Sequence, residues 1–186
     1  MMWEITFGGI IMRRIVFFLT AFALCLSLAA CGAKAPAPVT DPDAVTITVP
    51  ADLIGVENKK QLKEQFSGEG YLDAQLNDEG QVVLVMTREK HAALLADTER
   101  SIRESLEATI SAGDTSFTRI DANDDFTHYT VYIAGETLNT GENFYTVSLL
   151  FSSDLYYVVL GQPTPEVTVD YISEVTGEVV YTYPEG

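Results

Sequence analysis

The spacing of hydrophobic and polar positions predicts strands and helices from residue 45 onward. Residues 45–49 alternate β-branched apolar and polar side chains, which is typical of a strand. Residues 58–66 predict a short helix, which Asn58 and Gln61 open as a capping pair. The longest predicted helix covers residues 88–111, where one face recurs at spacings of three and four. The residues of that face are His91, Leu95, Thr98, Ile102, Leu106 and Ile110.

Three pairs of β-branched and aromatic runs, each interrupted by a short polar turn, predict three β-hairpins. The paired runs are residues 71–76 with 81–87, 116–122 with 126–134, and 166–173 with 178–183. The predicted strand 126–134 of the second hairpin has two faces by alternation. Its more apolar face consists of Tyr129, Val131 and Ile133. Its mixed face consists of Phe126, His128, Thr130 and Tyr132.

Residues 144–160 fit both a helix and a strand. Helical spacing relates five apolar residues, which are Phe144, Val147, Phe151, Leu155 and Val158. The β-prone run 156–159 favours a strand, but Gly161 is typical of a helix end. We therefore predict a mostly buried helix. The expected fold is α+β, with an antiparallel sheet built from successive β-hairpins and with two main helices and one short helix packed on it.

A basic pair, an apolar run and a small-residue motif follow one another near the N-terminus. Arg13 and Arg14 precede the uncharged residues 15–28, and Leu28-Ala29-Ala30-Cys31 closes this run. The order is the layout of a secretory signal. The run of 14 residues is shorter than the roughly 20 that a helix needs to span a bilayer.

This segment resembles the signal peptides of bacterial lipoproteins, because Leu28-Ala29-Ala30-Cys31 matches their lipobox at every position. The resemblance implies that Cys31 receives a diacylglyceryl thioether and becomes the mature N-terminus after cleavage behind Ala30. It also implies an extracytoplasmic protein that is anchored to the bacterial membrane. The chain as a whole is similar in layout to small surface lipoproteins of bacteria. The alternative is an ordinary secretory signal with a chance cysteine at the cut.

The resemblance divides the chain into three parts. Residues 1–30 are expected to be the signal peptide, with Met12 as the expected start of translation and an unusually long signal region as the alternative. Residues 31–44, rich in Pro and Ala, are expected to form a tether behind the lipidated cysteine. Residues 45–186 are expected to form a single extracytoplasmic domain, since their number suits one core.

Acidic residues outnumber basic ones, with 27 Asp and Glu against 11 Lys and Arg and a net charge of −16. This balance argues against a nucleic-acid-binding protein, because neutralising phosphates needs a basic face. Residues 104–186 contain Arg119 as their only Lys or Arg. The scarcity of basic residues in this second half fits a surface that attracts a cationic partner. Solubility and repulsion from an anionic envelope explain it more simply.

The residues that usually carry catalysis are sparse. His91 and His128 are the two histidines, and neither has the neighbouring Cys or His of a zinc site. The chain has no Gly-x-Ser-x-Gly or Ser-x-x-Lys motif for a nucleophile and no glycine-rich phosphate loop. Carboxylates are so numerous that their count alone indicates nothing about a catalytic pair. We therefore assign no catalytic, cofactor-binding or metal-binding residue.

The segment Asp121-Ala122-Asn123-Asp124-Asp125 resembles the first ligands of a calcium loop. Its sixth and twelfth positions are Phe126 and Tyr132, where such a loop requires Gly and Glu. A polar hairpin turn is favoured, with a weak exposed calcium site as the alternative.

Tyrosines are concentrated in the second half of the chain. Exposed tyrosines would suit a sugar- or peptide-binding face, but packing in the core and the sheet is the favoured interpretation.

From these observations we expect the protein to be a lipid-anchored extracytoplasmic module of the cell envelope, which binds a protein or peptide partner without catalysis. The membrane is the expected partner of Cys31. The first alternative is a small envelope hydrolase that uses carboxylates or His91 and His128, and the second is a weakly calcium-responsive surface protein.

Overall fold

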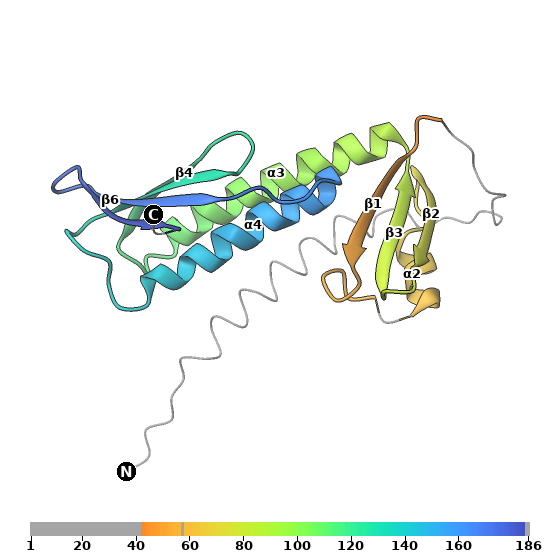
Figure 1. The fold of residues 1–186 in the computed structure, drawn as a ribbon, viewed down its shortest axis with the longest axis horizontal. Coiled ribbons are helices and arrows are strands. Elements are labelled where there is room, and N and C mark those ends of the chain that lie inside the picture. The colour runs from red at the N-terminus through yellow and green to blue at the C-terminus, as the bar shows by residue number, and fades with distance from the viewer. Residues whose placement is uncertain (1–41, 57, 185–186) are drawn as a thin grey trace, which may run out of the picture. The chain divides into compact units, whose positions relative to one another are not determined.

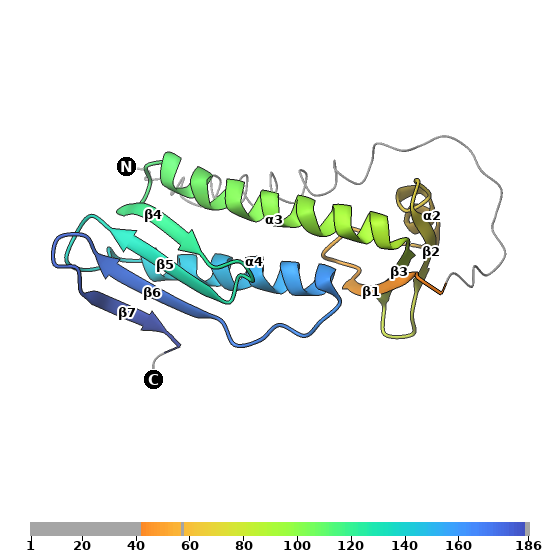
Figure 2. The same ribbon diagram turned by 90° about the horizontal axis from the view of Figure 1, so that it is seen from above.

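The computed structural model describes residues 42–56 and 58–184. In this part of the chain it has three α-helices and two sheets, so the predicted α+β class is confirmed (Figures 1 and 2). The chain divides into two compact units between His91 and Ala92. The span predicted as one domain therefore contains two compact units. None of the described helices is both long enough and apolar enough to cross a membrane.

The first unit contains a three-stranded antiparallel sheet in the order β1-β3-β2. Its elements are β1 (Val45–Pro50), α2 (Lys59–Gln65), β2 (Tyr71–Leu76) and β3 (Gln81–Met86). The predicted cap of α2 is confirmed, because Asn58 Oδ1 accepts hydrogen bonds from the backbone N–H groups of Lys60 and Gln61, each at 3.1 Å. The buried apolar residues of the first unit are Ile47, Val49, Val56, Leu62, Phe66, Val82, Leu84 and Met86.

The second unit contains a four-stranded sheet in the order β4-β5-β6-β7. Helix α3 (Arg88–Ser111) begins in the first unit and continues in the second. The other elements are β4 (Phe117–Ala122), β5 (His128–Ile133), η1 (Glu142–Phe144), α4 (Tyr145–Leu160), β6 (Thr168–Ser173) and β7 (Val179–Tyr183). Strands β5 and β6 pair in parallel, and the other neighbours pair antiparallel. Parallel pairing follows from the crossover through α4, which returns the chain to the same end of the sheet.

Helices α3 and α4 lie on the same face of this sheet (Figure 1). The alternation predicted for β5 is confirmed, since Tyr129, Val131 and Ile133 are completely buried under the helices. Val169 and Tyr171 of β6 continue this core. The sheet's other face, turned toward the viewer in Figure 2, carries mainly polar side chains.

The predicted face of α3 is largely confirmed. Thr98, Ile102 and Leu106 are buried, and Leu94 is buried as well although the expected face did not include it. In the same helix, Arg100 lies 3.9 Å from Glu104. Arg103 lies 3.9 Å from Asp124 and over the ring of Phe126.

Phe126 occupies a different place from the one expected. We predicted it on the mixed face of a strand, but it lies in the turn before β5 with a φ of 54° and is completely buried. Its ring packs edge-on against Tyr156, with the ring centroids 5.0 Å apart. The left-handed backbone turns the side chain out of the strand alternation and into the core.

The helical interpretation of residues 144–160 is confirmed, and the expected burial of its apolar face is wrong. Helix α4 ends at Gly161, whose φ of 74° is the left-handed conformation that closes helices. Phe144, Val147 and Phe151, which were expected in the core, are exposed. We call these three residues the α4 stripe.

Candidate functional site

The α4 stripe is an exposed apolar surface on a helix of the second unit. Phe144 is 75%, Val147 63% and Phe151 51% exposed. Phe144 ends η1 directly before α4, and the spacing of three and four residues places the three side chains above one another along one side of η1 and α4. The partly buried Leu155 continues this line one turn further. Adjacent large apolar side chains in water are an unfavourable arrangement unless another surface covers them.

Buried polar contacts explain why α4 turns this face outward. Thr146 Oγ1 lies 2.8 Å from the hydroxyl of Tyr171, so both groups are satisfied inside the core. Ser153 donates to the carbonyl of Phe126 at 2.7 Å and lies 3.1 Å from the hydroxyl of Tyr129. The small polar residues of α4 therefore complete the hydrogen bonds of buried tyrosines, which would be costly to leave unpaired.

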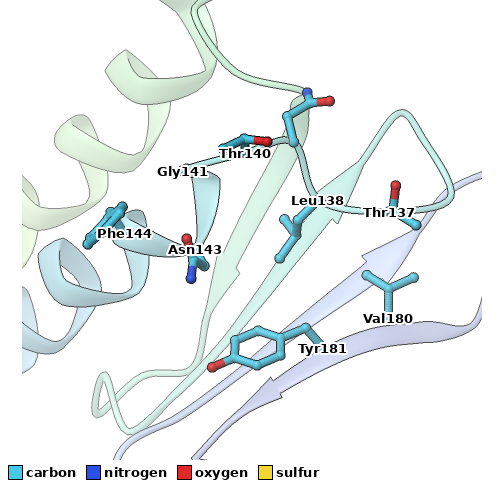
Figure 3. A pocket seen from close by; sticks show the side chains of 9 residues that line it. Thr137, Leu138, Thr140, Gly141, Asn143, Phe144, Val180 and Tyr181 are labelled. Carbon is cyan, nitrogen blue, oxygen red and sulfur yellow. The ribbon is translucent and has the colours of Figure 1, made fainter.

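A pocket of about 670 Å³ opens beside the N-terminal end of the stripe (Figure 3). The segment between β5 and α4 forms one side, and Val180 and Tyr181 of β7 form the other. Phe144 belongs to both the pocket and the α4 stripe. The remaining lining residues are Thr137, Leu138, Asn139, Thr140, Gly141 and Asn143. All of these side chains are uncharged, so the pocket suits apolar contacts and neutral hydrogen bonds rather than acid–base chemistry.

Glu142 holds the loop that forms the pocket wall. The residue is 6% exposed, and its carboxylate accepts hydrogen bonds from the backbone and hydroxyl of Ser116 and from the backbone and amide of Asn139. Burial acts to raise the pKa of Glu142, but the hydrogen bonds outweigh it and keep the pKa below its usual value. The buried charge thus fastens the loop to the start of β4.

The surface of the second unit is strongly acidic. Arg100, Arg103 and Arg119 are its only Lys or Arg residues. Each already has an acidic neighbour, since Arg100 pairs with Asp97, Arg103 with Asp124 and Arg119 with Asp121. The positive charge of this unit is therefore neutralised locally, and its remaining carboxylates determine the field around it.

The two histidines belong to different units, with His91 in the first and His128 in the second. His128 lies on the polar face of the sheet, where its Nε2 is 3.4 Å from Asp170 Oδ2 and 3.5 Å from Thr130 Oγ1. A histidine that activates a hydroxyl as a nucleophile contacts the hydroxyl with one ring nitrogen and the orienting carboxylate with the other. Because Asp170 and Thr130 approach the same nitrogen, this geometry does not form such a relay.

The turn that resembled a calcium loop directs its acidic groups to separate partners. Asp121 pairs with Arg119 at 3.3 Å, Asp124 lies near Arg103, and Asp125 accepts a hydrogen bond from Thr127. Asn123 Oδ1 accepts from the backbone N–H groups of Thr127 and His128. Over the described ranges, no group of three or more His, Cys, Asp or Glu side chains is placed to hold a metal ion.

We therefore expect millimolar calcium to leave the Tm of the protein unchanged, measured by differential scanning calorimetry against magnesium at equal ionic strength. Binding to the folded state alone would raise the Tm. A rise specific to calcium would support the calcium-responsive alternative, and Asp125→Asn should then abolish it.

The tyrosines of the second unit mainly build its core, as favoured from the sequence. Tyr129 and Tyr171 are completely buried, and Tyr156 and Tyr157 are each 8% exposed. Burial raises the pKa of Tyr129 to about 12, with the hydrogen bond to Ser153 opposing the shift. These side chains are therefore not free to form a sugar- or peptide-binding face.

The predicted lipidation site, Cys31, lies outside the described residues, as does most of the predicted tether. Of the tether, Asp43 is described, and it pairs with Arg88 at 3.0 Å. Comparisons with protein-family models, curated proteins and solved structures found no match to this chain.

Proposed function

We propose that this protein is a lipid-anchored, extracytoplasmic interaction module of a bacterial cell envelope, which binds a protein partner without catalysis. The observation that carries the binding function is the α4 stripe, with three exposed apolar side chains along one side of α4 and of η1 before it. The pocket beside Phe144 extends the same surface and contains no titratable lining group other than Tyr181. Such a surface buries apolar area against a partner but offers neither a base nor an activated nucleophile.

The anchoring function rests on the sequence around Cys31. A basic pair, an apolar run and Leu28-Ala29-Ala30-Cys31 follow one another as in the lipobox signals that they resemble. Two or three acyl chains on one cysteine hold a protein stably at a membrane, whereas a single chain gives marginal binding. Anchoring also raises the effective concentration of the protein beside other envelope proteins.

We expect Cys31→Ser to abolish both lipid labelling and membrane association. Cells that express either form are fed a clickable fatty-acid analogue, and the labelled chain is followed through membrane fractionation. Labelling and membrane retention of Cys31→Ser equal to the parent would contradict lipidation at this residue.

The binding function is tested by crosslinking in intact cells followed by mass spectrometry. We expect a specific envelope protein to be captured by the parent and lost with Phe151→Ser, because the substitution places a hydroxyl on the stripe. Val175→Ser is the matched control, since Val175 is 62% exposed but lies in the β6–β7 turn. Equal capture by all three forms would place the partner away from the α4 stripe. Capture of no specific protein would count against an interaction module.

A further inference from the structure

We propose that the partner segment seated on the α4 stripe is a positively charged amphipathic α-helix of another envelope protein. This inference rests on the proposed function and adds the shape and the charge of the partner. It follows from three properties of the surface, which are its direction along the helix, the internal hydrogen bonding of the helix backbone and its charge.

The stripe runs along the helix axis, which suits an elongated partner. From Phe144 to Phe151 it covers seven residue steps, or about 10 Å at roughly 1.5 Å per residue, and the partly buried Leu155 continues the line by one more turn. Its apolar side chains follow the spacing that a second helix matches with its own residues at intervals of three, four and seven. The pocket next to Phe144 provides a recess for one larger side chain at the end of this line.

The backbone of α4 selects a helix over a strand as the partner. A helix satisfies its peptide groups internally, so the flank of α4 has no free N–H or C=O groups to pair with an extended peptide. A strand laid across α4 would lose water from its own peptide groups without gaining hydrogen bonds. A partner helix brings its own hydrogen bonds and buries only its apolar side.

The charge around the stripe selects a basic partner. Asp154, one turn beyond Phe151, is the only charged residue of α4, which contains no Lys or Arg. Burial mainly, and then the charges of Glu99 on α3 and of Asp125 in the β4–β5 turn, raises the pKa of Tyr156, which lies on the core side of α4, so these two carboxylates add to the negative charge near α4 without lying on the stripe itself. The three arginines of this unit are neutralised locally, so the field that an approaching segment meets is negative.

The same charges disfavour the two other occupants of an apolar helix face. A second copy of this chain would bring a second acidic unit against the first, and like charges oppose such a contact. Helices that lie on membranes carry Lys and Arg beside their apolar face, which attract anionic lipids. Helix α4 has the opposite charge, so a lipid surface does not complement it.

The test places a photo-crosslinking phenylalanine analogue at Phe151 in the full chain, expressed in its own cells, and sequences the crosslinked peptide. The control position is Val175, an exposed apolar residue off the stripe. We expect the crosslink at Phe151, and not that at Val175, to identify a segment with a net positive charge and an apolar face of helical period. Asp154→Lys should lower the crosslink yield about two- to fivefold, as expected for one exposed ion pair, whereas Asp154→Glu should preserve it.

A crosslink from Phe151 to lipid, to a second copy of this chain, or to an acidic or non-helical segment would overturn the inference. So would the absence of any crosslink at this position, or an unchanged yield with Asp154→Lys. One outcome would separate the two proposals. If the capture of a specific protein depends on Cys31 and Phe151 but its crosslinked segment is not a basic helix, the proposed interaction module stands and only the basic helix is refuted. Failure of the module itself would appear as the loss of every specific partner in the earlier crosslinking experiment.

Discussion

Replacing Phe126 with alanine will lower the free energy of unfolding of the second unit by about 3–5 kcal/mol, the usual cost of removing a buried phenylalanine ring. The ring is completely buried, packs edge-on against Tyr156 and lies under the guanidinium of Arg103. Alanine would leave a cavity at the junction of α3, α4 and the β4–β5 turn. Urea unfolding followed by circular dichroism and tyrosine fluorescence measures the change.

Phe151→Ala is the matched control for this substitution. It removes the same ring from a residue that is 51% exposed, so the expected change is below about 1 kcal/mol. Similar losses for both substitutions would contradict the inward position of Phe126 and the outward position of the α4 stripe. A large loss with Phe151→Ala alone would mean that this helix face is covered within the protein itself.

Replacing Glu142 with alanine will cost about 2–4 kcal/mol at neutral pH, because hydrogen bonds to a charged group contribute about 1.5–3 kcal/mol and buried donors would lose their acceptor. The carboxylate accepts bonds from Ser116 and Asn139, which join the pocket loop to the start of β4. Glu142→Gln keeps the shape but turns an N–H₂ group toward these donors, so it should also destabilise. Unfolding free energies from urea titrations check both substitutions.

The pH dependence of this effect has a definite sign. The pKa of Glu142 is lower in the folded protein than its usual value, so the folded state binds the proton less tightly than the unfolded chain. Its stabilising contribution is complete above the unfolded pKa of about 4.3 and is lost as the pH falls through the folded pKa. The difference in stability between the parent and Glu142→Gln should therefore shrink below about pH 4. A constant difference from pH 7 to pH 3 would show that the charge of Glu142 does not stabilise the fold.

Most of the helices and strands were predictable because their limits depend on residues that are close together in the sequence. The limits of α3, the turns of the three hairpins and the cap at Asn58 all depend on residues that are neighbours in the chain. The alternation in β5 also identified Tyr129, Val131 and Ile133 as core residues, because a strand places every second side chain on the same face. The predicted anchor at Cys31 depends on a local motif in the same way.

The candidate surface could not be found from the sequence in this way. Both sides of α4 contain apolar residues, so hydropathy does not identify the buried one, and the spacing of Phe144, Val147 and Phe151 suggested a core face. The contacts that decide the question join Thr146 to Tyr171 and Ser153 to Tyr129, over separations of 25 and 24 residues. These hydroxyl pairs exist only once β5 and β6 lie beside α4.

Residue types and their spacing were enough to predict the type and limits of most elements, the core face of β5 and the acidic character of the second unit. The side of α4 that meets solvent, the position of the Phe126 ring and the parallel pairing of β5 with β6 became visible only in the folded protein. The first group depends on residue type and on spacing within a few residues. The second depends on partners far apart in the chain, because a buried hydroxyl must find an acceptor or donor that only the folded sheet supplies.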